Sequence, residues 1–84
     1  MTHAPPPPIE AAASWDAGFM GCGELVIDLR KRLKTMPGEV LCLTARDSGA
    51  PEDIPAWCRM TRNALIHHDP LTQRFWIRAR LEEA

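Results

Sequence analysis

The clearest candidate for chemistry in this chain is the thiol of Cys22, which stands between a glycine-punctuated stretch and a strongly helical run from Leu25 to Met36. A cysteine at the start of a helix faces unpaired backbone N–H groups and the positive end of the helix dipole. Both favour the thiolate, which is the form of the side chain that attacks other sulfur atoms. The placement therefore predicts a nucleophilic cysteine, and the alternative is an inert thiol that fills space in the core.

The other thiols and the histidines do not extend this site into a familiar pattern. Cys22, Cys42 and Cys58 are odd in number and form no Cys-x-x-Cys pair, so neither a disulfide framework nor a zinc site is expected. His67 and His68 have no fixed sequence relation to Cys22, which argues against a Cys–His hydrolase. We expect no metal and no organic cofactor. A redox sensor, in which Cys22 joins another cysteine on oxidation, stays open as a weaker alternative.

Length and composition limit the chain to one small domain. Its 84 residues are 45% apolar and 25% charged, which is ordinary for a soluble globular protein with a modest core. The net charge of −1 gives no reason to expect direct binding of nucleic acid. No apolar run is long enough to span a bilayer, and the first residues do not have the pattern of a secretory signal. We therefore expect a cytoplasmic protein.

Breaker residues and hydrophobic spacing divide the chain into a disordered proline-rich tail over residues 1–13, a folded domain over residues 14–81 and an acidic end over residues 82–84. Within the domain the expected elements are a strand near 15–17, a helix over 25–36, a strand over 40–45, a helix beginning at Asp53 or just before it with Pro55 in its first turn, and strands over 64–68 and 74–79. Two right-handed crossovers place both helices on one face of the sheet. The predicted fold is an α+β two-layer sandwich, β-α-β-α-β-β, with a mixed four-stranded sheet.

Spacing of the apolar residues indicates which side chains face the core. The predicted inward residues are Leu25, Leu29, Leu33, Met36, Leu41, Leu43, Ala45, Ile54, Trp57, Cys58 and Thr61. Cys42 then points to the other face of the sheet. If Phe75 and Ile77 face the helices, Trp76 lies exposed on that same outer face, where it would suit contact with a partner or a second copy.

Charged residues gather at two places. Arg30, Lys31 and Lys34 are close together on the first helix, which is usual for a solvated face and also suits the docking of an acidic protein partner. Asp47 and Asp53 flank the expected start of the second helix. Carboxylates there cap the helix and shape its approach loop, and the alternative for Asp47 is that it orients a partner or an incoming thiol.

The segment PGEVLCLTARDSGAPEDIPAWCRMT, residues 37–61, resembles the strand, Asp-x-Gly-Ala turn and Asp-Ile-Pro-Ala-Trp helix start of the TusA-like, or SirA-like, family of small sulfurtransferases and sulfur carriers. The resemblance extends from Asp16 to Arg80. It implies the same fold, and it implies that Cys22, six residues after Asp16, is the sulfur-carrying cysteine. The family's Cys-Pro-x-Pro motif is Cys22-Gly23-Glu24-Leu25 here, so both prolines are replaced.

These replacements change the junction that holds the thiol. Gly23 loosens the entry to the helix and adds a backbone N–H that can stabilise a thiolate or persulfide anion. Glu24 favours the helix start electrostatically, while its charge opposes thiolate formation at Cys22. Phe19 stands where the family has a glycine three residues before the cysteine. We expect Gly23, Glu24 and Asp16, together with the two aspartates near the second helix, to position the loop or to stabilise an anion on the thiol.

The resemblance implies a sulfur-relay protein. Such a protein accepts sulfane sulfur as a persulfide on Cys22 from a cysteine desulfurase or a rhodanese-like donor and passes it to an acceptor protein, with no metal or organic cofactor. Thiolation of tRNA, a molybdenum-cofactor pathway and sulfur oxidation are the candidate destinations. The alternative is a non-catalytic interaction or regulatory module that keeps the fold, which the missing prolines favour. A monomer or a weak dimer is expected.

Overall fold

The computed structural model describes residues 9–81, so the four-proline run and the acidic end over residues 82–84 lie outside the described residues. It contains six elements: β1 (Ala13–Asp16), α1 (Cys22–Lys34), β2 (Val40–Thr44), α2 (Ala50–Thr61), β3 (Ala64–Asp69) and β4 (Arg74–Arg78). The β-α-β-α-β-β order expected from the sequence is confirmed. The backbone N–H of Ala12, just before β1, donates to the carbonyl of Val40 at 2.8 Å.

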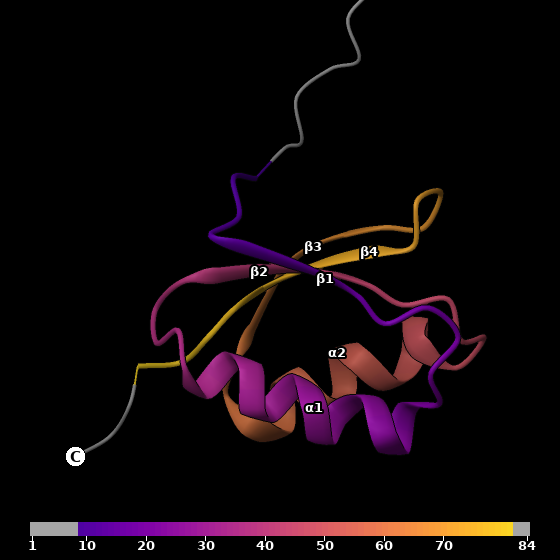
Figure 1. Cartoon of the computed structure of the whole chain (residues 1–84), viewed down its shortest axis with the longest axis horizontal. Coiled ribbons are helices and arrows are strands. Elements are labelled where there is room, and N and C mark those ends of the chain that lie inside the picture. Colours follow the sequence, from indigo (N-terminus) through magenta and orange to yellow (C-terminus); the bar gives the residue numbers. More distant parts are fainter. Residues whose placement is uncertain (1–8, 82–84) are drawn as a thin grey trace, which may run out of the picture.

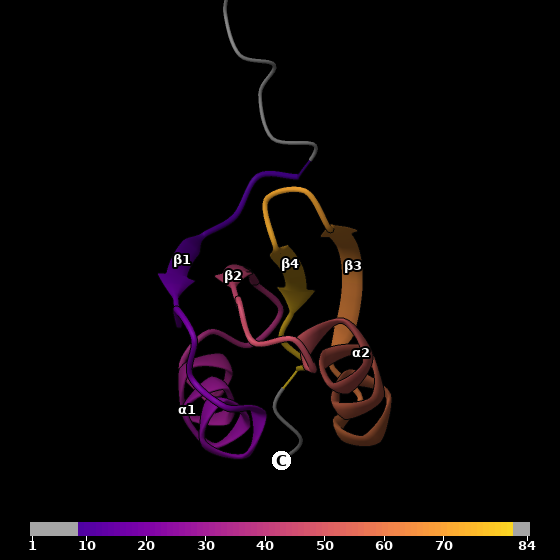
Figure 2. The ribbon, with the colours of Figure 1, turned by 90° about the vertical axis from the view of Figure 1, so that its right-hand side faces the viewer.

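The four strands form one mixed sheet in the order β1-β2-β4-β3. β1 runs parallel to β2, and β4 pairs antiparallel with both β2 and β3. Figure 1 shows the sheet as one layer and the two helices as the other, and Figure 2 shows α1 and α2 side by side on the same face. The predicted α+β two-layer fold is therefore confirmed. Neither helix of the described range is long and apolar enough to cross a membrane.

The core lies between the helices and the sheet. It contains the predicted stripe of α1, the inward side chains of β2, Ile54 and Cys58 from α2, and Phe75 and Ile77 from β4. Cys58 is 2% exposed, which confirms its expected role in packing, and burial raises the pKa of its thiol to about 11. Trp57 is only partly buried and packs against the edge of this core. Helical spacing and strand alternation thus predicted most of the core correctly.

Both helices begin about three residues before the apolar pattern. α1 begins at Cys22 and α2 at Ala50, where Ala50 is buried in the core and Cys22 packs against it. The two residues that follow each of them are exposed, so one inward residue alone gives little hydrophobic pattern at each helix start. Acidic residues in these first turns still favour a helix start through the helix dipole. As a result Pro51 occupies the first turn of α2, and Pro55, expected there, lies inside the helix.

The expectation that Trp76 is exposed is wrong, because its side chain is only 2% exposed. Strand alternation itself holds, since Phe75 and Ile77 belong to the core cluster between helices and sheet, and Trp76 does not. Neighbouring side chains on the outer face cover Trp76 itself, and the His67 ring lies 5.3 Å from the Trp76 ring. Burial removes the basis for a docking role of this tryptophan.

Candidate functional site

The β1–α1 and β2–α2 loops lie at the same edge of the sheet, because β1 and β2 are adjacent and parallel. The backbone N–H of Arg46 donates to the carbonyl of Gly18 at 2.8 Å, and that of Ala17 donates to the carbonyl of Thr44 at 2.8 Å. The Arg46 guanidinium also reaches the Asp16 carboxylate at 3.4 Å. These contacts tie the loop before α1 to the loop before α2.

Cys22 meets Asp47 across this junction. Its Sγ donates a hydrogen bond to Oδ2 of Asp47 at 3.3 Å, although the two residues are 25 positions apart in the chain. Cys22 is the first residue of α1 and is half-buried, and the cap residue Gly21 is extended (φ −64°, ψ 149°) with no side-chain cap bond. The thiol thus lies at the first helical turn, whose N–H groups have no helical partners, and beside a carboxylate.

A second carboxylate lies close to the first. Oδ2 of Asp47 accepts a hydrogen bond from the Gly49 N–H at 3.0 Å, which forms a tight turn before α2. A Cβ atom added to Gly49 would lie 3.0 Å from Oδ2 of Asp53 and 3.2 Å from Oδ2 of Asp47. The absence of a side chain at Gly49 therefore lets both carboxylates approach the turn. Neither aspartate is the N-cap residue of α2 as expected. Gly49 holds that position, and α2 has no capping hydrogen bond from the side chain of its N-cap residue.

The environment of Cys22 favours the protonated thiol. Burial raises its pKa to about 12, and the hydrogen bonds and negative charges of Asp47 and Asp53 act in the same direction. At pH 7 a thiol with that pKa is ionised in only about one molecule in 100,000. From the sequence, the helix start favours the thiolate and Glu24 opposes it, so the sequence alone does not decide the direction of the pKa shift. In the folded chain burial raises the pKa of Cys22, and two carboxylates far away in the sequence add to the effect.

The two loops that form this site lie within a segment of the chain that matches a known protein family. A family model described as "Sulfurtransferase TusA" matches residues 16–79, which include both loops, both helices and strands β2 to β4. The chain belongs to the TusA sulfurtransferase family. The resemblance predicted from residues 37–61 is thereby confirmed. Membership supports a sulfur-relay role, with sulfur donors and acceptors as the expected kinds of partner.

In this TusA-family chain the other predicted site residues fall into separate places. Asp16 accepts a hydrogen bond from the Gly18 N–H at 2.8 Å, which, with the Arg46 contact, holds the pKa of its carboxyl below the usual range. Gly23 and Glu24 are exposed in the first turn of α1. The basic residues Arg30, Lys31 and Lys34 are exposed farther along α1 and are remote from the Cys22–Asp47 contact in the chain.

Sequence reasoning missed Arg46, although an arginine directly after a strand is a natural partner for Asp16 once β1 and β2 are paired. Gly49 was expected only as part of the Asp-x-Gly-Ala turn, in which the aspartate accepts from a backbone N–H two residues later. What the sequence did not indicate is that this turn faces the thiol.

Cys42 lies away from this edge, on the outer face of the sheet. It is half-buried and lines a cavity of about 490 Å³ together with Arg74 and Trp76. Burial raises the pKa of its thiol, and the charge of Arg74 partly opposes that shift. Across residues 9–81 no group of three or more His, Cys, Asp or Glu residues is arranged to hold a metal ion.

Replacing Gly49 with Ala is expected to disturb the site without unfolding the domain. The backbone at Gly49 (φ −83°, ψ −12°) suits alanine, but the added Cβ would force both carboxylates to move by a few tenths of an ångström. We expect the alkylation rate of Cys22 to change about threefold or more, while the free energy of unfolding changes by less than about 1 kcal/mol. Gly21→Ala is the matched control for the alkylation rate, because nothing lies within 4 Å of the added atom.

Replacing Gly23 with Ala is expected to stabilise the start of α1. Gly23 has open space around the position of a Cβ and lies in an exposed helical turn, so alanine lowers the entropy lost on folding without a clash. Urea denaturation should show a gain of about 0.4–1 kcal/mol. Gly38→Ala should have the opposite sign, because Gly38 has a φ of 78° and Leu81 Cδ2 lies 3.1 Å from the added Cβ. Equal changes in the free energy of unfolding for Gly23→Ala and Gly38→Ala would contradict the placement of Gly23 in the first turn of α1.

Proposed function

We propose that this chain carries sulfane sulfur as a persulfide on Cys22. The observation that supports this most directly is the hydrogen bond from Cys22 Sγ to Asp47 Oδ2, at 3.3 Å, in a chain of the sulfurtransferase family. A thiol with a carboxylate at hydrogen-bonding distance has a proton acceptor in place before a partner arrives. Cys22 is therefore the catalytic residue, and Asp47 is the residue that takes its proton.

The first transfer step balances without an oxidant or a reductant. Cys22 Sγ attacks the outer sulfur of a donor persulfide as its proton passes to Asp47 Oδ2. A new S–S bond forms on Cys22, the donor's S–S bond breaks, and the donor sulfur leaves as a thiolate that takes the proton from Asp47. In the second step an acceptor thiol attacks the outer sulfur as its own proton passes to Asp47. The S–S bond on Cys22 breaks, and the Cys22 thiolate takes that proton from Asp47.

Two opposite influences act on the negative charge that develops on Cys22 Sγ in these steps. The first-turn N–H groups of α1, including that of Gly23, stabilise an anion on Cys22. Glu24 and Asp53 oppose it. Because the free protein holds the thiol protonated, the donor must complete the site by bringing compensating positive charge close to Cys22. The chain then acts on a docked partner and reacts slowly with free small molecules.

Partner docking involves the surface around the thiol. Phe19, three residues before Cys22, is 80% exposed and offers an apolar contact beside it. The exposed cations of α1, which are Arg30, Lys31 and Lys34, suit an acidic surface on the donor. A cysteine desulfurase or a rhodanese-like protein is the expected donor, and another protein thiol is the expected acceptor. The chemistry requires no metal or organic cofactor, and cytoplasmic location stays a prediction.

Intact-protein mass spectrometry after incubation with a cysteine desulfurase and cysteine tests this proposal. The wild-type chain should gain one sulfur atom that a reducing agent removes, and Cys22→Ser should gain none. Cys42→Ser is the matched control, since Cys42 is also half-buried but lies on the other face of the sheet. Sulfur gain that survives Cys22→Ser and is lost in Cys42→Ser would overturn the assignment. The experiment is repeated with a rhodanese and thiosulfate to cover both donor classes.

A non-catalytic interaction module is the second candidate. The observation in its favour is the raised pKa of Cys22, about 12, which leaves the resting thiol almost wholly protonated. In that case Cys22→Ser would leave partner binding and the biological role unchanged, and neither donor would load sulfur. Loss of the biological role in Cys22→Ser, with an unchanged free energy of unfolding, would exclude the module.

A further inference from the structure

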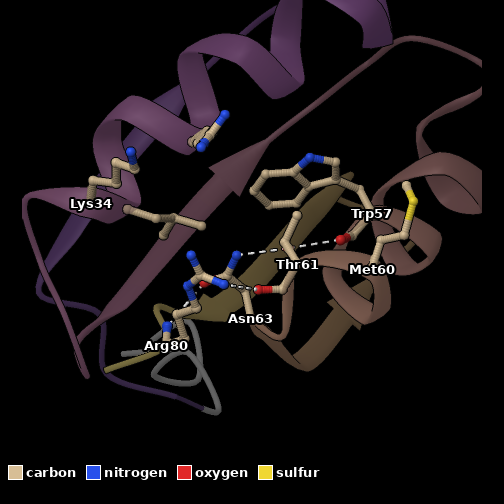
Figure 3. Close-up of a pocket in the computed structure, with 8 residues that line it drawn as sticks. Lys34, Trp57, Met60, Thr61, Asn63 and Arg80 are labelled. Carbon is tan, nitrogen blue, oxygen red and sulfur yellow. Dashed lines mark hydrogen bonds between the residues drawn. The ribbon is translucent and has the colours of Figure 1, made fainter. Parts of the chain in front are cut away.

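A groove separates the C-terminal parts of the two helices, away from Cys22. Its volume is about 310 Å³, and it is lined by Arg30 and Lys34 from α1, by Trp57 from α2, and by Arg80 after β4. We call it the α1–α2 groove (Figure 3). Arg30 is eight residues after Cys22, which corresponds to about 12 Å along the helix. The groove and the thiol are therefore separate features.

The wall of the groove is strongly positive. Arg30, Lys34 and Arg80 contribute three cations, and none of the lining residues is acidic. None of these three residues forms an ion pair with another residue in the described part of the chain. Three unpaired like charges around one small space repel one another, so an anion placed between them would be stabilised. The charge pattern indicates a ligand that carries negative charge.

Arg80 is held in place for such a contact. Its backbone N–H donates to Oδ1 of Asn63 at 2.9 Å, and its Nη1 donates to the carbonyl of Thr61 at 3.2 Å. Asn63 in turn donates from Nδ2 to Oγ1 of Thr61 at 2.8 Å. Figure 3 shows the Arg80 guanidinium pointing into the space between Lys34 and Trp57. A guanidinium has five N–H donors, so donors remain for an oxyanion.

Trp57 adds an aromatic surface beside the cations. Its side chain is half-buried and lines the groove. An exposed indole surface stacks well with a planar ring, and arginine with lysine is the usual pair of residue types around a phosphate. The volume is at the lower end of the range of small-molecule pockets, about 300–1,000 Å³.

We propose that the α1–α2 groove binds a small phosphorylated ligand with a planar ring, of the size of a mononucleotide. The phosphate lies among Arg30, Lys34 and Arg80, and the ring lies against Trp57. The site is independent of the thiol, so the ligand is expected to bind equally well to Cys22→Ser. It also differs from a docking surface for an acidic protein, because ring stacking adds to the contribution of charge.

Titration of the full ¹⁵N-labelled chain with AMP, followed by NMR, tests the proposal. Signals of the Trp57 indole N–H and of the Asn63 and Arg80 amides should shift together and saturate, with a Kd below about 1 mM. Adenosine keeps the ring without the phosphate, and inorganic phosphate keeps the charge without the ring. Both should bind at least about fivefold more weakly than AMP. Equal binding of phosphate and AMP would overturn the assignment of a ring-bearing ligand.

Charge variants of α1 give a matched comparison. Lys34→Gln and Arg30→Gln each remove one cation from the groove and should weaken AMP binding about fivefold or more. Lys31→Gln removes the same charge from the same helix, but Lys31 does not line the groove, so its Kd should change by less than about twofold. Equal weakening in all three variants, or no saturable shift of the Trp57 signal, would overturn the proposal. Tighter binding of an acidic peptide with displacement of AMP would assign the groove to a protein partner instead.

Discussion

The alkylation rate of Cys22 in the folded chain should rise about tenfold for each pH unit between about pH 7 and pH 9, without a plateau. Only the thiolate reacts with iodoacetamide, and a pKa of about 12 lies well above this range. The rate should therefore increase about a hundredfold over two units. Burial is the first cause of the raised pKa, and Asp47 and Asp53 add to it. Peptide mapping by mass spectrometry follows Cys22 separately from Cys42 and Cys58.

The same chain in concentrated urea is the matched control. Unfolding exposes Cys22 to water and separates it from both carboxylates, so its pKa should return to the ordinary value near 8.5. The rate in urea should then flatten above about pH 9 and exceed the folded rate many-fold at about pH 8. A folded-state rate that is already constant between about pH 7 and pH 9 would mean a stable thiolate, and it would contradict the protonated site.

Replacing Asp47 with Asn should speed alkylation and slow sulfur transfer. The change removes a negative charge beside Cys22 Sγ and replaces a carboxylate by a neutral amide that can also donate to a thiolate, so the pKa of the thiol falls and the thiolate fraction rises. A fall of one unit gives about tenfold faster alkylation. The same change removes the proposed proton acceptor, and loss of a positioned general base costs about a hundredfold in rate or more. In Asp47→Asn the alkylation rate should therefore rise while the sulfur-transfer rate falls.

Glu52→Gln provides the control for this pair of measurements. Glu52 is an exposed acidic residue in the first turn of α2, like Asp53, and it has no part in the pKa shift of Cys22. In Glu52→Gln the alkylation rate of Cys22 and the sulfur-transfer rate should both stay within about twofold of wild type. If Asp47→Asn instead speeds transfer as much as it speeds alkylation, Asp47 only suppresses the thiolate, and its assignment as the proton acceptor is wrong.

One of the residues that replace the motif's prolines, Leu25, has a role in packing. Leu25 stands at the position of the motif's second proline, and here its side chain is 0% exposed in the core. Its backbone N–H donates to the Gly21 carbonyl at 2.9 Å, a bond that proline could not make. At this end of α1, Leu25 therefore contributes a core side chain and a regular helical hydrogen bond.

The sequence by itself determined the order of the elements, the fold class and most of the core. These features depend on local information: helical spacing from Leu25 to Leu33, alternation around Leu41 and Leu43, and breakers such as Pro37 and Gly38. Such patterns depend on residues a few positions apart, and the structure confirms them. The helix boundaries were less accurate, because a single small inward residue in each first turn, Cys22 or Ala50, gives little hydrophobic pattern.

Only the tertiary structure decided how the site behaves. Parallel pairing of β1 and β2 brings Asp47 to Cys22 across 25 positions, and a tight turn at Gly49 brings Asp53 close as well. The covering of Trp76 on the outer face also depends on segments remote in sequence. The pKa of a thiol depends on burial and on charges within a few ångströms, and these are fixed by strand pairing rather than by neighbours along the chain.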